Sequence, residues 1–388
     1  MRQRADAVAH RRVGVFVGSY LPYSETFIHD QLRSHRRFRA AVFAYERLPG
    51  SARRFPFAPV HALCGADRMV YWVTGRARAF DAAIRAERPE LLHAHFGTNG
   101  VYAAAFARRH RLPLVVTFHG HDVPALVGRA RFTARYARYA ALAGPMLRQA
   151  ALLLPASRDL ADRLIRDVGA DARKVEVLPL GVDAARFDAM AQRDRAPMVL
   201  RDSAPTVLMV GRLVEKKGHL YGLRAFAAAH ARVPDARLVL IGDGPLRRDV
   251  LWEIDRLGIG AAVHLTGPLS APAVASWMLR AHVLCCPSVT AQNGDVESGV
   301  IVVKEAAAAA LPTVGTRHGG IPELIVDGET GVLVDERDVA RTADALVRLL
   351  SDSGLREQMG RAARDDARRR FDLRRQVARL EDLYDAVG

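Results

Sequence analysis

The carboxylates Glu297 and Glu305 stand at the two ends of the segment ESGVIVVKE, which leads into an Ala-rich run. If one helix carried both, eight residues at ~1.5 Å rise would separate them by ~12 Å. The carboxyl groups of a glycosidase lie about 5 Å apart in retaining enzymes and at most about 9.5 Å apart in inverting ones. Hydrolysis by this pair is therefore disfavoured, and we expect the glutamates to contact different parts of one elongated ligand. The alternative roles are a helix cap for Glu297 and a surface charge for Glu305.

A short loop with two adjacent cations, Gly211–Gly218 (GRLVEKKG), follows a predicted strand and opens onto a predicted helix. A helix N-terminus favours anions, because its free N–H groups and the positive end of its dipole point at the ligand. The chain has 53 arginines and four lysines, and two of the four, Lys216 and Lys217, lie in this loop. Because an ammonium is not interchangeable with a guanidinium at a phosphate, we interpret the loop as a diphosphate site. A solvated charged turn is the alternative.

Histidines of the first half gather after two predicted strands, as His93 and His95 and then as His119, His121 and the adjoining Asp122. Adjacent loop positions point in different directions and no HExxH-like spacing is present, so metal binding is disfavoured. A histidine at a strand end can instead donate to a sugar hydroxyl or a phosphate. His93 lies inside a strand and is interpreted as a core residue.

Short Val/Ile/Leu runs alternate with longer segments of helical period, which is the pattern of β-α-β units. The predicted strands are 12–17, 91–95, 114–118, 151–155 and 175–178, then 206–210, 237–241, 263–265, 283–286, 313–315 and 331–334. We therefore expect an α/β fold with two doubly wound Rossmann-like domains, whose ligands bind at the carboxyl ends of the strands. Gly18 follows the first strand, where a glycine lets the backbone approach a phosphate, although a tight turn explains it equally well.

The expected organisation has four parts: an N-terminal domain over 1–185, a linker over 186–204, a C-terminal domain over 205–370 and a closing helix over 371–388 that packs near the N-terminal domain. The linker is expected because Asp, Arg, Ala and Pro dominate there. The closing helix is expected because its apolar residues recur at helical spacing. Three cysteines (Cys64, Cys285 and Cys286) form neither a disulfide framework nor a zinc spacing, so we expect them to be reduced.

The formal net charge of +15 resides in the first half: residues 1–200 carry 32 Lys and Arg against 17 Asp and Glu, and residues 201–388 carry 25 of each sign. A basic half attracts polyanions. No zinc finger, RNA-recognition signature or aromatic-basic interleaving indicates nucleic acid, so an anionic membrane surface or a phosphorylated acceptor is preferred. Neither a signal peptide nor an apolar run of roughly 18 residues is present. We expect a cytoplasmic location, with peripheral attachment at the inner face of the membrane.

Residues 128–150 are the candidate for that attachment. Within them, arginines alternate with large apolar side chains at helical spacing: Arg129, Arg131, Arg135, Arg138 and Arg148 with Phe132, Tyr136, Tyr139 and Leu142. A basic amphipathic helix can lie at a membrane interface. The apolar stripe of such a helix more often faces the protein's own core, and both interpretations stand at this point.

Together these motifs resemble the retaining glycosyltransferases of family four, which have the GT-B fold, from about Gly14 to Val334. The E-x7-E element Glu297–Glu305 is the most specific, followed by LPTVGT, HGGIPELI and DGETGVLV, and then by GRLVEKKG, IGDGPLR and VLPLGVDAARF. SETFI, HAHFG and TFHGHD are similar to the exopolysaccharide-building, colanic-acid-type branch. Two positions depart from the family pattern: Gly299 lies one place earlier than the glycine of E-x-F-G, and Leu180 stands where Asn is frequent.

The resemblance implies a hexosyltransferase-like enzyme that takes a UDP- or GDP-linked sugar donor and a glycan or lipid-linked acceptor of cell-surface polysaccharide synthesis. It also implies a role for each of seven residues: Arg212 and Lys217 hold the donor diphosphate, Glu305 takes the ribose hydroxyls, the backbone at Leu269 meets the base, Gly18 approaches the phosphates, and Glu297 and His119 are catalytic, at the donor sugar and near the reacting centre. Transfer would proceed with retention, by front-face attack in which the leaving phosphate helps to remove the acceptor proton. No cofactor or metal is expected, because the cations replace it.

Two other functions remain open. A transferase that decorates a small secondary metabolite would have a near-neutral acceptor and would not explain the basic half. A non-catalytic nucleotide-sugar binder would share the fold, but the charged residues of the predicted site are all present. Nucleotide release distinguishes an enzyme from a binder.

Overall fold

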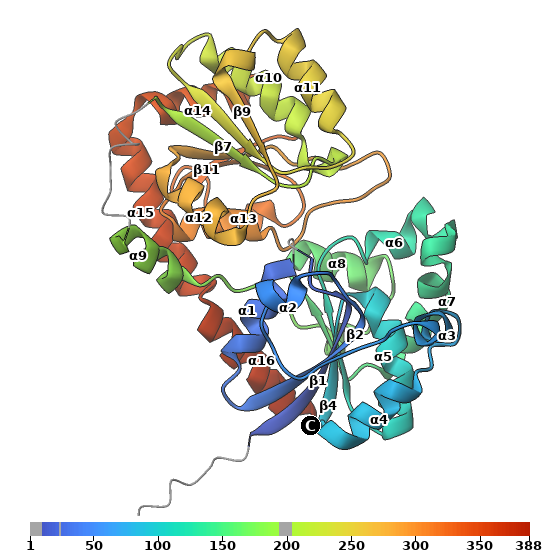
Figure 1. The fold of residues 1–388 in the computed structure, drawn as a ribbon. Helices are drawn as coiled ribbons and strands as arrows, with labels where there is room; N and C mark the ends of the chain where they lie inside the picture. The colour runs from blue at the N-terminus through green and yellow to red at the C-terminus, as the bar shows by residue number, and fades with distance from the viewer. Residues whose placement is uncertain (1–9, 23–24, 194–203) are drawn as a thin grey trace, which may run out of the picture.

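Two parallel six-stranded sheets, one in each half of the chain, organise the structure (Figure 1). The structure is a computed structural model that describes residues 10–22, 25–193 and 204–388. The N-terminal sheet has the order β3-β2-β1-β4-β5-β6, formed by β1 (Arg11–Tyr20), β2 (Phe38–Arg47), β3 (Val60–Ala62), β4 (Leu91–His95), β5 (Leu114–Phe118) and β6 (Leu152–Pro155). The C-terminal sheet has the order β12-β11-β10-β7-β8-β9, formed by β7 (Thr206–Val210), β8 (Arg237–Ile241), β9 (Val263–Gly267), β10 (Val283–Cys286), β11 (Thr313–Thr316) and β12 (Gly331–Val334).

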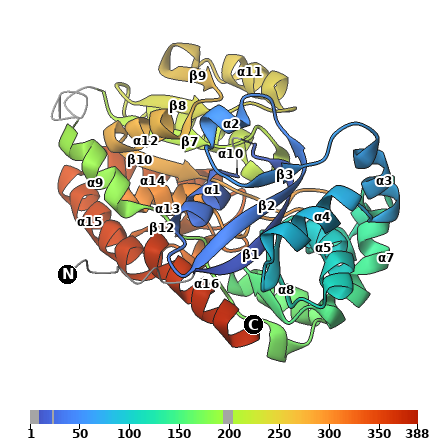
Figure 2. The ribbon, with the colours of Figure 1, turned by 60° about the horizontal axis from the view of Figure 1, so that its bottom comes forward.

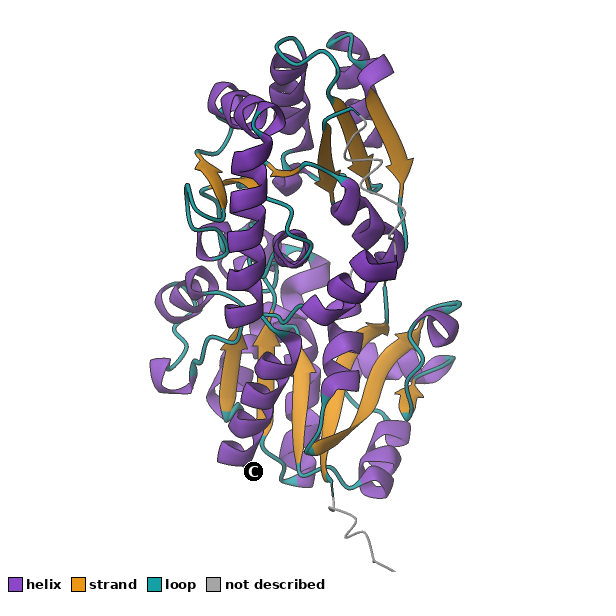
Figure 3. Cartoon of the chain, turned by 90° about the vertical axis from the view of Figure 1, so that its left-hand side faces the viewer, coloured by secondary structure: helices purple, strands orange, loops and turns teal. Residues whose placement is uncertain are grey.

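Helices pack around both groups of strands (Figure 3). Those of the first half are α1 (Thr26–Ser34), α2 (Ser51–Arg54), α3 (Ala66–Thr74), α4 (Arg78–Glu87), α5 (Gly97–His110), α6 (Pro124–Val127), α7 (Ala134–Gln149) and α8 (Arg158–Arg166). Those of the second half are α10 (His219–His230), α11 (Arg247–Arg256), α12 (Ala271–Arg280), α13 (Ile301–Ala308), α14 (Val339–Ser351) and α15 (Ser353–Arg370). Between the domains lies α9 (Ala184–Arg193), and the chain ends with α16 (Leu373–Val387).

The strand order of each sheet reverses beside its first strand, between β1 and β4 in the N-terminal sheet and between β7 and β10 in the C-terminal sheet. All the strand pairs are parallel, so the carboxyl ends of each sheet share one edge. Such reversals create the crevice in which ligands of doubly wound sheets bind. The two-domain α/β arrangement is the GT-B fold, as predicted.

Six predicted strands have the observed bounds, and two observed strands, β2 and β3, were not predicted. The missed strand β2 is buried along most of its length. A parallel strand covered on both faces has no polar alternation, and its Ala- and Arg-rich sequence resembles a helix. The segment 175–178, predicted as a strand, makes a single bridge from Val175 to Leu153. The segment lies alongside β6 and is held there by two backbone hydrogen bonds of 3.0 Å, from Glu176 N–H to Leu153 O and from Leu178 N–H to Pro155 O.

The segment between the sheets contains α9, which begins within the apolar core of the C-terminal domain. Val182, Ala184 and Phe187 are buried there. Residues 194–203 of the expected linker lie outside the described residues, as do residues 1–9 and Ser24 of the SETFI motif.

The terminal helix α16 packs against the N-terminal domain, beside α1 (Figure 1). Its Tyr384 hydroxyl lies 2.6 Å from His93 Nδ1, and His93 Nε2 lies 2.7 Å from Thr117 Oγ1. Both ring nitrogens of His93 therefore have partners, which confirms it as a core histidine. Glu381 of α16 accepts the backbone N–H groups of Arg36 and Arg37 at 2.8 and 2.9 Å.

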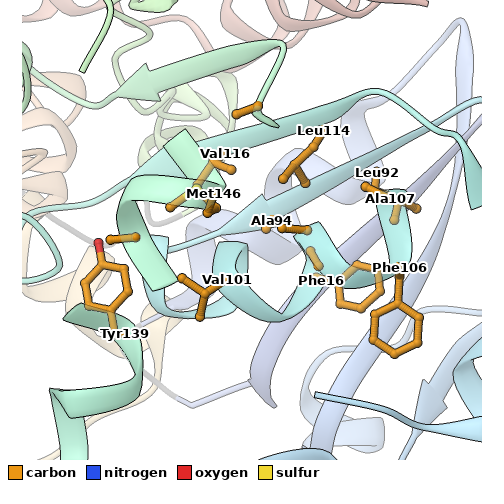
Figure 4. Close-up of a cluster of buried hydrophobic side chains, with 14 of the residues drawn as sticks. Phe16, Leu92, Ala94, Val101, Phe106, Ala107, Leu114, Val116, Tyr139 and Met146 are labelled. Atoms are coloured by element: carbon orange, nitrogen blue, oxygen red, sulfur yellow. The ribbon is translucent and has the colours of Figure 1, made fainter. Parts of the chain in front are cut away.

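The apolar stripe of α7 belongs to the core of the N-terminal domain. Tyr139 and Met146 are 3% and 1% exposed and lie with Phe16 and Val116 in the cluster of Figure 4. Phe132 precedes α7 and is exposed, while the side chains of Arg129 and Arg135 lie outside the described part of the chain. Of the two interpretations of residues 128–150, packing against the core is therefore the one that holds for α7, and its stripe is not available to a membrane.

Candidate functional site

The loop GRLVEKKG joins β7 to α10 at the carboxyl edge of the C-terminal sheet. Its last residue, Gly218, has φ +64°, and a Cβ there would lie 1.8 Å from the carbonyl oxygen of Pro287. Any side chain at this position would collide with backbone, so glycine is required for the loop to fold against the chain that leaves β10. This approach brings Lys217 beside the segment that contains Glu297.

A buried ion pair joins the two predicted motifs. Lys217 Nζ lies 3.1 Å from Glu297 Oε2, and the side chains are 18% and 9% exposed. Burial opposes both charges, but Glu297 raises the pKa of Lys217, and the two lysines together lower the pKa of Glu297. Lys216 Nζ binds Asp295 Oδ1 at 3.1 Å and the carbonyl oxygen of Val296 at 3.2 Å. The loop therefore holds two ammonium groups beside one carboxylate that remains ionised.

Glu297 is positioned through its backbone. Its N–H donates to His318 Nε2 at 3.0 Å, and His318 Nδ1 lies 2.6 Å from Glu336 Oε1. Because Nε2 accepts, the proton of a neutral His318 lies on Nδ1 and is donated to Glu336. Within the described residues, Glu297 Oε1 is buried without a hydrogen-bond partner. A ligand hydroxyl is the kind of donor that this oxygen lacks.

Glu305 lies on α13, which begins at Ile301, so Glu297 precedes the helix that carries Glu305. Burial raises the pKa of Glu305 to about 7, an effect that Arg186 opposes and Asp30 reinforces. Asp30 comes from α1 of the N-terminal domain and Arg186 from α9. Sequence reasoning had not connected either residue with Glu305, because neither lies near it along the chain.

His119 follows β5 and lies among aromatic rings. Its Nε2 is 3.1 Å from His95 Nδ1, and its ring centroid is 4.9 Å from that of Phe27 and 4.5 Å from that of Phe96. Burial and the neighbouring His95 lower the pKa of His119 well below its usual value, and burial lowers the pKa of His95 to about 3. Both imidazoles are thus neutral near pH 7. His119 Nδ1 has no hydrogen-bond partner in the described structure.

Asp122 holds the loop that carries His119. The fully buried carboxylate accepts the backbone N–H of Gly120 and that of Gly97, each at 3.0 Å. It therefore ties the end of β5 to the start of α5 and has a structural role. Across the described chain, no three His, Cys, Asp or Glu side chains are grouped as a metal site would need.

The structure corrects the surroundings expected for Gly18. Strand β1 continues through Tyr20, so Gly18 lies within the strand and not in a turn after it. A Cβ at this position would have Asn99 at 3.6 Å as its nearest neighbour, which is an ordinary contact. Leu269 follows β9 and is partly buried against the core of the C-terminal domain.

Arg212 interacts electrostatically with Glu25 of the N-terminal domain. Burial raises the pKa of Glu25, just before α1, to about 7, and the charge of Arg212 opposes that rise. Sequence reasoning had not connected Glu25 with Arg212, because the two residues lie in different domains. Glu25 belongs to the SETFI motif, which was the available signal.

The two domains meet close to the segments that carry Glu297 and His119. Ser157 Oγ lies 2.9 Å from Ser298 Oγ, and a Cβ on Gly120 would lie 3.3 Å from Ser298 Cβ. Glu323 of the C-terminal domain accepts the N–H groups of Arg158 and Asp159 at 2.8 and 2.9 Å, at the start of α8. Glu297 and His119 are therefore carried on segments that face each other where the two domains touch.

Comparison with known proteins decides the family. Residues 25–186 match the family described as Glycosyltransferase Family 4, and residues 190–366 match Glycosyl transferases group 1. The D-inositol 3-phosphate glycosyltransferase of Paenarthrobacter aurescens is 30% identical over 307 residues, which is 78% of this chain and 74% of that protein. The chain belongs to glycosyltransferase family four.

The transferase also matches the GDP-mannose-dependent alpha-(1-6)-phosphatidylinositol monomannoside mannosyltransferase of Mycolicibacterium smegmatis, at 37% identity over 214 residues. That match spans 54% of this chain and 56% of the mannosyltransferase. Among solved structures, HepE of Anabaena, in complex with UDP and glucose, superposes with a TM-score of 0.77 at 19% identity, over 97% of this chain and 100% of that one. This likeness shows the fold.

The two departures from the family pattern meet in space in this transferase. A Cβ on Gly299 would lie 3.1 Å from Leu180 Cδ1 and 3.1 Å from Ala156 Cβ. The carbonyl of Leu180 accepts a hydrogen bond from Lys304 Nζ at 2.9 Å.

None of the described helices has the length and apolar character that a membrane span requires.

Proposed function

We propose that the transferase moves a sugar from a UDP- or GDP-linked donor, with retention, onto an acceptor of cell-surface polysaccharide or lipid-linked glycan synthesis. The observation that carries the proposal is the buried pair of Lys217 and Glu297, 3.1 Å apart. It lies after β7 and β10, where the strand order of the C-terminal sheet reverses. The ammonium group of Lys217 suits a diphosphate, and Glu297 Oε1, which has no hydrogen-bond partner among the described residues, suits a sugar hydroxyl.

In the proposed reaction, Lys217 and Arg212 stabilise the negative charge that develops on the leaving diphosphate. The bond between the anomeric carbon and the phosphate oxygen breaks while the acceptor oxygen attacks the same face. The acceptor proton passes to the leaving phosphate oxygen, so that the products are a glycoside and a nucleoside diphosphate. Glu297 holds the donor sugar, and the neutral His119 offers Nδ1 near the reacting centre.

The nucleoside part of the donor is assigned to two further positions. Glu305 takes the ribose hydroxyls, and its partly buried carboxylate, which interacts with the charge of Arg186, suits hydrogen bonding to a polar ligand. The backbone at Leu269 meets the base. A solved relative in fold holds UDP, and a relative in sequence is named for GDP-mannose, so both bases enter the test.

The test is a donor panel with purified transferase. UDP-glucose, UDP-N-acetylglucosamine and GDP-mannose are each incubated with and without a membrane extract, and release of the nucleoside diphosphate is measured. We expect one donor to be turned over, faster when the extract supplies the acceptor, and the product to keep the anomeric configuration by NMR. Tight donor binding without release of any nucleotide would instead establish a binder, and an inverted product would overturn the retaining mechanism.

A further inference from the structure

Helix α3 presents an apolar face that nothing in the described structure covers. Met69, Val70, Trp72 and Val73 are 64%, 48%, 56% and 55% exposed, and Tyr71 alone among the residues of this helix is buried. Exposed apolar side chains are ordinary when they are scattered singly. Four within five consecutive residues form a continuous patch, which we call the α3 face.

Contacts with α5 and α7 fix the orientation of the α3 face. The Tyr71 ring stacks on that of Tyr102 with 4.7 Å between centroids. Tyr102 donates its hydroxyl to the carbonyl of Trp72 at 3.3 Å, and Arg138 Nη1 donates to the carbonyl of Val73 at 2.6 Å. Helices α5 and α7 therefore hold the backbone of α3 on the inner side, and its exposed apolar side chains face away from them. The helix itself lies at the edge of the N-terminal domain (Figures 1 and 2).

The charge around the face is positive. Arg76 and Arg78 follow α3 directly, are exposed, and make no ion pair with any described residue. The surrounding half of the chain, residues 1–200, carries 32 Lys and Arg against 17 Asp and Glu. The second exposed tryptophan, Trp252 on α11, is 64% exposed but belongs to the half with equal numbers of both charges. The α3 face thus lies in the basic half of the chain, and the patch around Trp252 lies in the half without excess positive charge.

We propose that the α3 face docks the transferase onto an anionic lipid membrane. Tryptophan beside arginine is suited to the boundary between headgroups and acyl chains. Each arginine near an anionic leaflet contributes about 1 kcal/mol, and apolar side chains add the free energy of their burial. A second copy of the chain would bring two basic halves together, and like charges oppose that contact. Attachment through α3 leaves α7 in the core, where the structure places it.

The test is sedimentation of the full chain with vesicles of phosphatidylglycerol and phosphatidylcholine in equal parts, and with vesicles of phosphatidylcholine alone. Wild type should bind the mixed vesicles and bind the neutral ones weakly. Trp72→Ser/Val73→Ser should weaken binding to mixed vesicles by about ten-fold or more, because two apolar anchors are lost. The matched control Trp252→Ser removes an equally exposed tryptophan from the neutral half and should change binding by less than about two-fold. Arg76→Gln/Arg78→Gln should weaken binding to the mixed vesicles by about ten-fold or more, since two arginines are lost.

Insertion is followed by fluorescence of a variant that keeps Trp72 as its one tryptophan, Trp252→Phe/Trp277→Phe. A blue shift with mixed vesicles supports the proposal. Unchanged vesicle binding by Trp72→Ser/Val73→Ser overturns it, and so does a concentration-dependent dimer in lipid-free buffer that these substitutions disperse. Nucleotide release measured on the same variants keeps this outcome separate from the proposed function, since none of the substituted residues lies in the donor site.

Discussion

Replacing Lys217 with alanine is expected to affect ligand binding and stability by separable amounts. Its Nζ makes a charge-assisted contact of 3.1 Å with Glu297 and, in the proposed complex, a similar contact with the donor diphosphate. One such bond to a charged group is worth about 1.5–3 kcal/mol. We therefore expect the affinity for UDP or GDP to fall by about ten-fold to ~150-fold.

The same substitution leaves Glu297 buried beside Lys216 alone, whose Nζ is 3.8 Å from Glu297 Oε1. An unsatisfied buried acceptor costs about 1–3 kcal/mol, and the remaining ammonium should hold the loss to about 2 kcal/mol, or a fall in Tm of about 4–8 °C. In the double variant Lys217→Ala/Glu297→Gln, the buried charge of Glu297 is removed as well, and much of the lost stability should return. The diphosphate affinity should not return. Because the pKa of Glu297 is lowered in the folded state, its stabilisation is present at neutral pH and is lost as the pH falls below about 4.3.

Titration calorimetry with UDP and with GDP measures the affinity, and thermal unfolding measures the stability. The matched control is Lys216→Ala, since Lys216 is held by Asp295 and by the carbonyl of Val296 at 3.1 and 3.2 Å. It should keep the diphosphate affinity within about three-fold. Two results would refute the reasoning: wild-type affinity for both diphosphates in Lys217→Ala, or affinity that returns together with stability in the double variant.

Three further outcomes are expected. Glu305→Ala should weaken UDP or GDP binding in calorimetry, and wild-type affinity should rise as the pH increases through about 7, because the carboxylate must be ionised to accept the ribose hydroxyls. Because the pKa of Glu305 is raised in the folded state, the free energy of unfolding should fall as the pH rises from about 4.3 to about 7. Glu305→Gln should remove this fall in urea titrations. An unchanged pH dependence in Glu305→Gln would contradict the raised pKa of Glu305. Glu297→Gln should lower kcat on an identified acceptor, and wild-type kcat would exclude its catalytic role. Glu323→Gln should cost about 1 kcal/mol in urea unfolding, because its carboxylate caps the first N–H groups of α8 across the domain boundary; no loss would make that contact dispensable.

The fold was largely predictable because the signal of a buried parallel strand is local. Val-, Ile- and Leu-rich runs such as 114–118 and 206–210 were recognised with their observed bounds. β2 and β3 were not, since β2 is rich in Ala and Arg and β3 has three residues. The segment 128–150 shows a different limit. Its periodicity identified a helix, but the pattern of α7 is the same whether its stripe meets lipid or core, and the partners that decide this, Phe16 and Val116, come from other strands.

The candidate site was predictable where one segment carries the information. The lysine pair and Glu297 were chosen from their own loops, and the structure brings Lys217 and Glu297 together. Contacts made across the chain were beyond sequence reasoning: Glu25 near Arg212, Asp30 near Glu305, and His318 behind the backbone of Glu297. Each pairs residues separated by another strand or domain, and neither spacing nor residue type encodes that proximity.

The two departures from the family pattern illustrate the same coupling, because they are neighbours in space. In sequence, Leu180 and Gly299 are unrelated changes, but in space a side chain on Gly299 would meet both Leu180 and Ala156 at 3.1 Å. Leu180 and Ala156 occupy the space next to position 299, and a larger residue there would require them to shift. The carbonyl of Leu180 also anchors Lys304, whose Nζ lies 4.9 Å from the Phe371 ring centre. Glu305 is the next residue along α13, so the packing at Leu180 sets the place of the helix turn that carries the predicted ribose ligand.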